Sequence, residues 1–288
     1  MKTLAVFFFS FLFPPLLFAQ KTDKKLEKEI EQLISGFNGN IGVYVKNLKN
    51  NKIVSINADT VFPTASMVKV PILVGTMDKI EKGELKINQQ LKYRDSLLYA
   101  GEDILGSFKD TEQIELGKVI MLMLTMSDNT ASLWLQSLAG TGSRINYIMD
   151  SLAFVDTRVN SRTPGREVNR SQFGWGQTTP KEMATLMEMI VNGKIINAER
   201  SAQMLRFLSR NYWDQVSISQ IPPDVFIASK NGAVDQSRSE VLFVNGKKAR
   251  YLFCICTKNN KDQSWNSTNE AWVLMRKISK LLWDHFNN

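Results

Sequence analysis

Histidine is almost absent from this chain of 288 residues, because His285 is the only one. A Ser-His-Asp or Cys-His mechanism would have to use that residue. His285 lies near the C-terminus in an amphipathic segment, WVLMRKISKLLWDHFNN, and we interpret it as a solvent-facing helix residue. A serine nucleophile in this chain would therefore need another base, and lysine is the first candidate.

Cysteine is nearly as rare, with Cys254 and Cys256 alone. They stand two positions apart in RYLFCICTK, which is typical of a strand. Their side chains then share one face, and the extended backbone holds them too far apart for an easy disulfide. We expect two buried apolar thiols, and the chain offers too few neighbouring ligands for a metal site.

Long apolar runs are missing except at the N-terminus. MKTLAVFFFSFLFPPLLFAQ has one lysine, an apolar stretch and Ala19, which is the layout of a secretory signal peptide over residues 1–19. The alternative, an uncleaved anchor, is disfavoured by Pro14 and Pro15 and by the short length. We therefore predict export across the inner membrane to the periplasm, with no stable membrane insertion.

The chain also lacks a cluster of like charges. The net charge at pH 7 is +8, but the basic residues are scattered and no nucleic-acid-binding motif is visible. We expect no nucleic-acid partner, and we attribute the positive balance to the surface of a bacterial envelope protein.

Strand patterns occupy both ends of the chain. Alternation predicts strands at 41–48 and 51–59, and three more at 224–234, 239–246 and 247–258. Asn245-Gly246 is a hairpin signal. Helical spacing predicts one helix at 24–34 and a closing helix from about 268 to 286.

The middle of the chain, 64–210, is mostly helical in pattern. Thr179 can cap a helix, Pro180 suits its first turn, Glu182 completes a capping box and Gly193 is a stop signal. The predicted fold class is α+β: an antiparallel five-stranded sheet flanked by N- and C-terminal helices, with an inserted all-α domain. The predicted sheet subdomain is 20–62 with 215–288, and the helical one is 63–214. Together they would form one catalytic domain with a cleft at the junction.

Ser66 and Lys69 stand three residues apart in FPTASMVKVPI, so on a helix they face the same way. A serine in the first turn lies among free backbone N–H groups, which can hold an oxyanion. Burial or a nearby cation lowers the pKa of a lysine and makes it a usable base. Alone the pair is weak, since Thr64 can be the cap and Ser66 a first-turn residue.

Two further triplets strengthen this interpretation. Ser127-Asp128-Asn129 lies between two helical runs, and Lys230-Asn231-Gly232 lies in the first C-terminal strand. Separately they read as a helix-cap turn and a strand irregularity. Three such motifs in this order and context are far less frequent by chance.

With these motifs the chain resembles the penicillin-recognising serine enzymes, most closely the class A beta-lactamases. The similarity covers nearly the whole chain after the signal peptide, through FPTASMVK, MSDNTAS, TTP at a helix start and KNGAV on a strand. Asn231 departs mildly, because the family usually has Thr or Ser there to contact the substrate carboxylate. The resemblance implies a beta-lactamase/transpeptidase-like fold.

The resemblance also implies the catalytic roles. Ser66 would attack the lactam or amide carbonyl, with Lys69 as its base or as part of a proton relay. Ser127 would pass a proton to the departing nitrogen. The backbone N–H groups of Ser66 and Ala233 would form the oxyanion hole.

Substrate contacts follow in the same way. Asn129 would bind the substrate's side-chain amide, and Lys230 would draw in its carboxylate. Arg238 is a further candidate carboxylate partner, and Tyr99 is either a cleft wall or an ordinary packing aromatic. The other implied substrate-binding positions are Asn231, Gly232 and Ala233. No cofactor or metal is implied; the expected partner is a small molecule, a beta-lactam or an acyl-D-amino acid peptide, and we expect a monomer.

The resemblance breaks just before the TTP motif. Class A enzymes carry a glutamate there that activates the deacylating water, and counting back without a gap puts Thr163 in its place. The only acid of this loop is Glu167, where those enzymes usually have asparagine. Ser161 and Gly176 replace the ion pair that usually ties the loop. Either Glu167 reaches the water by a different route, or it is a solvated loop residue and the acyl-enzyme turns over slowly.

Three functions remain open at this point. The first is a beta-lactamase, the second a D-alanyl-D-alanine peptidase or esterase on the same machinery, and the third a penicillin-binding protein that keeps the adduct. The lack of a signalling span, a membrane anchor or an extra domain favours the first. The missing glutamate favours the second or third.

Overall fold

The structure is a computed structural model that describes residues 21–101 and 103–287. The predicted signal peptide lies outside the described residues. Within the described ranges, none of the helices has the length and apolar character needed to cross a membrane.

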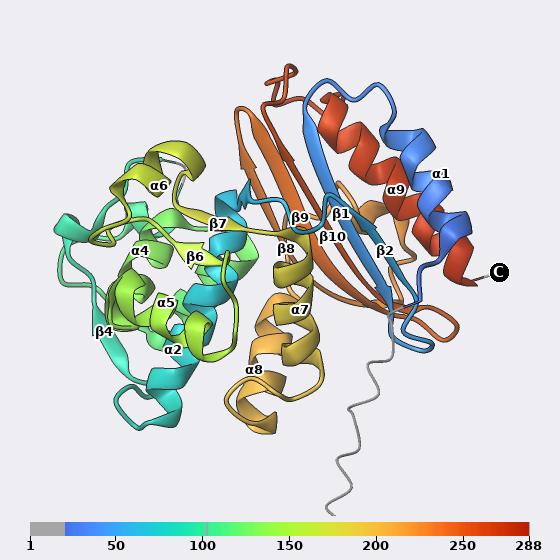
Figure 1. The fold of residues 1–288 in the computed structure, drawn as a ribbon. Helices are drawn as coiled ribbons and strands as arrows, with labels where there is room; N and C mark the ends of the chain where they lie inside the picture. The colour runs from blue at the N-terminus through green and yellow to red at the C-terminus, as the bar shows by residue number, and fades with distance from the viewer. Residues whose placement is uncertain (1–20, 102, 288) are drawn as a thin grey trace, which may run out of the picture.

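A five-stranded antiparallel sheet forms the centre of the molecule, as predicted (Figure 1). Its strands are β1 (Asn40–Asn47), β2 (Ile53–Ile56), β8 (Phe226–Val234), β9 (Ser237–Asn245) and β10 (Arg250–Lys258). The spatial order is β2-β1-β10-β9-β8, so strands from the two ends of the chain lie next to each other. β8 is an edge strand, which leaves one side of its backbone outside the sheet.

Helices cover both faces of this sheet. The helices are α1 (Lys24–Ile34), α2 (Lys69–Glu81), α3 (Leu116–Met121), α4 (Asn129–Leu138), α5 (Thr141–Ser151), α6 (Glu167–Phe173), α7 (Pro180–Val191), α8 (Ala198–Leu208) and α9 (Glu270–Asn287). Figure 1 shows α1 and α9 together on one face and α7 on the other, with α2, α4, α5 and α6 grouped beyond one edge.

The region between β2 and β8 is mostly helical but contains more than α-helices. Its short strands are β3 (Phe62–Pro63), β4 (Gln90–Lys92), β5 (Gln113–Glu115), β6 (Arg158–Val159) and β7 (Gly176–Thr178). Short helical turns are η1 (Ala65–Val68), η2 (Asp95–Leu97), η3 (Leu105–Ser107), η4 (Leu122–Met126) and η5 (Ile218–Gln220). Strands this short carry too little alternation for a sequence pattern to reveal them. The boundaries of the two subdomains stay a prediction.

Two hydrophobic cores explain why the sheet is buried on both sides. Along β9, Val241 and Phe243 join the core on the α7 side, while Leu242 and Val244 join the core under α1 and α9. Successive strand side chains point to opposite faces, so a nearly continuous apolar run is what a two-sided sheet requires. Cys254 and Cys256 share the α7 face as free, buried thiols, which confirms the prediction for them.

The start of α7 follows the predicted cap in part. The hydroxyl of Thr179 accepts a hydrogen bond from the backbone N–H of Glu182, and Pro180 is the first helical residue. The Glu182 carboxylate does not complete a capping box. It accepts hydrogen bonds from the backbone N–H groups of Val155 and Thr157 instead, because the preceding loop brings those donors closer.

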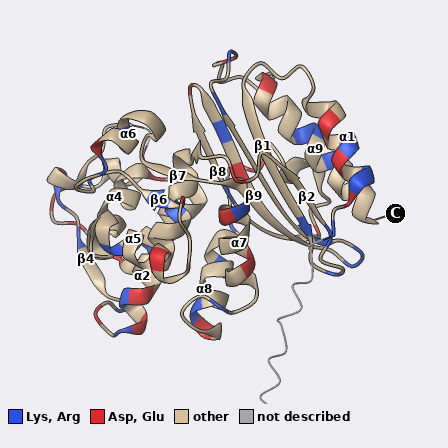
Figure 2. Cartoon of the chain, viewed as in Figure 1, with Lys and Arg blue, Asp and Glu red and all other residues tan. Residues whose placement is uncertain are grey.

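Charged side chains are dispersed over the fold. In Figure 2 basic and acidic residues alternate along α1 and appear at both ends of the molecule, rather than gathering on one face. This distribution agrees with the scattered charges of the sequence.

Candidate active site

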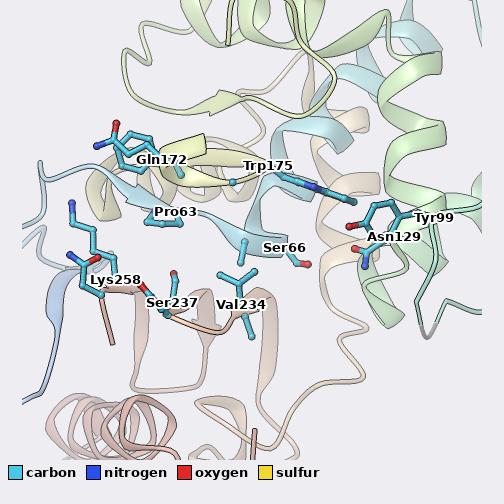
Figure 3. Close-up of a pocket in the computed structure, with 15 residues that line it drawn as sticks. Pro63, Ser66, Tyr99, Asn129, Gln172, Trp175, Val234, Ser237 and Lys258 are labelled. Carbon is cyan, nitrogen blue, oxygen red and sulfur yellow. The ribbon is translucent and has the colours of Figure 1, made fainter. Parts of the chain in front are cut away.

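A cleft of about 460 Å³ opens where the edge strand β8 meets η1 and the loop that precedes β7 (Figure 3). Its lining residues come from distant parts of the sequence. They are Pro63, Ala65, Ser66, Tyr99, Asn129, Gln172, Phe173, Gly174, Trp175, Ala233, Val234, Gln236, Ser237, Lys258 and Asn259. Of the predicted site residues, Ser66, Tyr99, Asn129 and Ala233 therefore line one cavity.

Backbone geometry presents Ser66 to this cleft. Ala65 has a φ of 43°, and the chain then turns through η1 into α2. The backbone N–H of Ser66 faces Gly232 so closely that a Cβ at Gly232 would lie 2.7 Å from the Ser66 nitrogen. Only glycine permits this approach. The backbone amides of Ser66 and Ala233 are thereby brought to the same part of the cleft.

Lys69 is fully buried one turn after Ser66. Its Nζ lies 3.1 Å from Ser66 Oγ, 3.1 Å from Ser127 Oγ and 2.9 Å from Asn129 Oδ1, and it also donates to the Ser127 carbonyl. Burial lowers the Lys69 pKa to about 7, and the negative charges of Asp103 and Asp128 oppose this shift. A lysine with this pKa is partly neutral at physiological pH and can take up a proton.

Ser127 reaches Lys69 through an unusual backbone. It follows the π-helical turn η4 and adopts a left-handed conformation with φ 62°. Asp128 then caps α4 by accepting from the N–H of Ala131 at 2.7 Å. Asp103 accepts from the N–H of Asn129 at 3.0 Å, which fixes the asparagine side chain beside Lys69. The cap and the functional group are thus parts of one turn.

Lys230 and Asn231 occupy β8 next to this cluster. Lys230 is fully buried, and its Nζ donates to the Asn231 carbonyl at 2.8 Å and to Asn231 Oδ1 at 3.2 Å. Burial and the nearby Lys69 lower the Lys230 pKa, whereas buried Glu240 opposes the shift. Asn211 Nδ2 lies 3.5 Å from the same Asn231 oxygen.

Arg238 is not brought to the cleft. It is buried on the opposite face of β9, with its guanidinium 4.6 Å from the Trp265 ring centre and 4.7 Å from that of Trp272. It donates to backbone carbonyls, including those of Ser237 at 3.0 Å and Ser264 at 2.9 Å. The predicted role as a carboxylate partner does not fit this position, because β8 and β9 are joined by only two residues and Ser237 takes the cleft side.

Neither Thr163, at the position of the usual glutamate, nor Glu167, the candidate base, lines the cleft. Thr163 is 7% exposed, its hydroxyl donates to the Ser161 carbonyl, and it packs against Gly142 of α5. Glu167 is an exposed residue whose carboxylate accepts from the N–H of Gly165 at 3.1 Å.

In the loop between β6 and β7, hydrogen bonds stand in place of the ion pair that Ser161 and Gly176 replace. The Ser161 hydroxyl donates to Gln136 at 2.7 Å, and Arg166 donates to Gln177 at 2.8 Å. Gly176 packs against Val68 in the η1 turn, which also contains Ser66.

Several lining residues were not anticipated from the sequence. Trp175 packs edge-to-face on Tyr99 with ring centres 4.9 Å apart, and the available signal was a tryptophan between two glycines ahead of the TTP motif. Ser237 and Lys258 line the far end, and no local pattern pointed to them.

Comparison with known proteins identifies the family of this chain. A family model described as the beta-lactamase enzyme family matches residues 25–286. Beta-lactamase VEB-1 of Pseudomonas aeruginosa is 22% identical over an alignment of 293 residues, gaps included. The alignment covers 96% of this chain and 95% of that protein. The imipenem-hydrolyzing beta-lactamase of Enterobacter cloacae is 26% identical, over 80% of this chain and 79% of its own length. The chain therefore belongs to the beta-lactamase enzyme family of penicillin-recognising serine hydrolases, which confirms the predicted resemblance.

Solved structures share the fold. PBP-A, in a variant forming an acyl-enzyme complex with penicillin G, superposes with a TM-score of 0.81 at 24% identity and covers 93% of this chain and 98% of its own. The TLA-1 extended-spectrum beta-lactamase gives a TM-score of 0.82 at 15% identity, over 92% and 99% of the two chains. At these identities the likeness establishes the fold alone.

Proposed function

We propose that this protein opens beta-lactam rings through an acyl-enzyme on Ser66 and releases the product slowly. The observation that carries the proposal is the buried Lys69 amine, within hydrogen-bonding distance of both Ser66 Oγ and Ser127 Oγ in a cleft. The apolar N-terminal run supports export to the periplasm as part of the same proposal.

Acylation follows from these contacts. Neutral Lys69 takes the proton of the Ser66 hydroxyl, and Oγ bonds to the lactam carbonyl carbon. The backbone N–H groups of Ser66 and Ala233 stabilise the developing oxyanion. The carbon–nitrogen bond then breaks, Ser127 gives its proton to the leaving nitrogen, and protonated Lys69 restores it to Ser127. Asn129 Oδ1 accepts from Lys69, so its amide N–H₂ is available to the substrate's amide carbonyl.

Slow deacylation is supported by the loop before β7. Hydrolysis of the ester needs a base that removes a proton from water. Thr163 packs on α5 and Glu167 faces solvent, and the described residues that line the cleft include no Asp or Glu. We therefore assign the usual base neither to Thr163 nor to Glu167.

Labelling with a fluorescent penicillin tests the nucleophile. We expect covalent labelling of the parent protein and complete loss of labelling in Ser66→Ala, with an unchanged circular dichroism spectrum. Ser219→Ala, at an exposed serine, is the matched control and should label like the parent. Labelling that survives Ser66→Ala would remove the proposal.

The second candidate function is a D-alanyl-D-alanine peptidase of the same mechanism. The lack of a cleft carboxylate among the described residues favours it, since such an enzyme has no need to hydrolyse a penicillin adduct quickly. Intact-mass spectrometry after penicillin addition separates the two. An adduct that decays slowly to opened penicillin, with no D-alanine set free from an acyl-D-Ala-D-Ala peptide, indicates the slow lactamase. A persistent adduct together with release of D-alanine from that peptide indicates the peptidase.

A further inference from the structure

The cleft continues past Ser66 to a polar end that the proposed acylation chemistry does not use. Figure 3 shows Lys258 and Ser237 on the side of Ser66 away from Asn129 and Tyr99. No acidic residue lines the described cleft, and Lys258 is the one charged side chain in its lining.

Ser237 and Lys258 lie at the ends of two neighbouring strands. β9 pairs with β10 as far as Ser239 opposite Cys256, and Ser237 and Lys258 each follow two residues beyond that pair. Side chains two apart on a strand share a face, and Cys256 lies on the α7 face. Both polar groups therefore point from neighbouring strands toward the same side of the sheet, where the cleft lies.

The Ser237 hydroxyl is an unsatisfied buried group. The residue is 2% exposed, and within the described structure its Oγ has no hydrogen-bond partner. A buried hydroxyl without a partner costs free energy, so such a group at a cleft wall is a candidate ligand contact.

Lys258 supplies the charge. Its Nζ donates to the Val61 carbonyl at 2.7 Å and lies 4.9 Å from the Phe62 ring centre. An ammonium has three N–H donors, and this contact uses one of them. Among the described residues no carboxylate lies within ion-pair distance of Lys258, and partial burial lowers its pKa. A partly desolvated cation without a carboxylate partner, in the same cleft lining as a hydroxyl without a hydrogen-bond partner, is suited to an anion.

The course of β8 decides which part of the substrate reaches this end. Gly232 lies beside the Ser66 nitrogen. Lys230 precedes Gly232 by two residues, and Val234, which pairs with Ser237, follows it by two. At about 3.3 Å per residue these positions lie on opposite sides of the nucleophile. The leaving group is assigned to the side of Lys230 and Ser127. Asn129 is assigned only the amide next to the reacting carbonyl, so the distal part of the acyl group is assigned to the side of Val234, Ser237 and Lys258.

We propose that Ser237 and Lys258 form a subsite for a carboxylate carried on the acyl side of the substrate. The inference rests on the proposed acylation of Ser66 and names its preferred substrate class: acyl donors with a second, distal acidic group, such as acidic peptides. The subsite acts in recognition and takes no part in bond breaking.

Matched penicillins test this directly. 6-Aminopenicillanic acid acylated with glutaric or adipic acid is compared with the same compounds bearing a terminal carboxamide in place of the carboxylate. The second-order rate constant for acylation of Ser66 is read by intact-mass spectrometry. We expect the carboxylate to react about tenfold faster at one of the two lengths, the effect of one charge-assisted hydrogen bond.

Variants assign the preference to the subsite. For each variant we take the ratio of the acylation rate constant of the carboxylate compound to that of the carboxamide compound. A general loss of activity lowers both rate constants and cancels in this ratio. Lys258→Gln should bring the ratio close to one, Ser237→Ala should lower it about threefold, and Lys258→Arg should retain most of it. Lys194→Gln, at an exposed lysine between α7 and α8, should keep the parent ratio.

Salt gives a test that needs no variant. The parent ratio should fall as ionic strength rises from about 0.01 to 0.5 M, since a partly exposed pair is screened. The subsite is overturned if the carboxylate and carboxamide compounds react at equal rates at both lengths. It is also overturned if the ratio is unchanged in folded Lys258→Gln or does not change with salt. These outcomes leave the proposed acylation of Ser66 standing. No acylation by either compound overturns the proposed function and the subsite with it.

Discussion

At the level of single residues, the acylation proposed for this protein depends on the burial of Lys69. An ordinary lysine stays protonated near neutral pH and cannot act as a base. Complete burial disfavours the charged amine and brings its pKa to about 7, although Asp103 and Asp128 act against the shift. The sequence supplied the residue at the right spacing from Ser66, and packing supplies the altered proton affinity.

A pH dependence of acylation follows from this residue. The base must be neutral, so the acylation rate should rise with pH between about 6 and 8, with a midpoint near 7. Stopped-flow labelling of Ser66 by a fluorescent penicillin at each pH measures it. Lys69→Arg removes the neutral form and should lose at least a hundredfold in rate. A flat profile over this range in the parent would contradict the assignment of Lys69 as the base.

Arg238 is another buried cation, but it lies behind the cleft wall and has no assigned role in the chemistry. Its guanidinium packs against two indole rings that meet edge-to-face, and it donates to the carbonyls of Asp235 and Ser237 at the β8–β9 turn. The turn residues Val234 and Gln236 line the cleft, so Arg238 positions the cleft wall from behind.

We predict that Arg238→Met lowers the free energy of unfolding by about 2–4 kcal/mol, because backbone carbonyls lose a buried donor. Urea denaturation measures this. Arg210→Met, at an exposed arginine, is the control and should change the free energy of unfolding by less than about 0.5 kcal/mol. A loss of substrate affinity with no loss of stability would return Arg238 to the role first predicted for it.

Among the elements, the loop between β6 and β7 carries the proposal of slow deacylation. It carries α6, ends at Trp175 against Tyr99, and is held by Ser161–Gln136 and Arg166–Gln177 hydrogen bonds. The sequence revealed which residues are missing from the family pattern. It did not reveal where Thr163 points, because that direction depends on the packing of the loop against α5.

Restoring a glutamate at position 163 should therefore not restore fast turnover. Thr163→Glu forces a carboxylate into a buried position against Gly142, and we expect the free energy of unfolding to fall by about 2–4 kcal/mol. The lifetime of the penicillin adduct, followed by mass spectrometry, should not shorten. Thr163→Ser keeps the hydroxyl and serves as the control. A shorter adduct lifetime in a stable Thr163→Glu protein would show that this side chain turns to the cleft.

At the scale of the whole molecule, the two ends of the chain complete one sheet. β1 pairs along its full length with β10, and α9 covers the same face as α1. The buried positions of α9 recur at helical spacing: Ala271, Leu274, Met275, Ile278, Ser279 and Leu282. The helix therefore closes the second core rather than forming an appendage.

A chain that ends at Asn269 should consequently fail to fold. Removing α9 exposes the apolar face of β9 and β10, including Leu242, Val244 and Phe253. We expect loss of the cooperative thermal transition by circular dichroism and loss of Ser66 labelling. Retention of a parent-like transition would mean that the sheet is stable without its outer layer.

Three properties can be read from the sequence alone: the strand and helix pattern at both chain ends, the three motifs, and the need for a base other than histidine. These properties are local: alternation, capping and residue identity are written within a few positions. Tertiary structure alone decided that Lys69 is desolvated, that Arg238 and Thr163 face away from the cleft, and that Ser237 and Lys258 extend it. The reason is that cleft walls are assembled from residues far apart in the chain, and which face each presents depends on turn length and long-range packing.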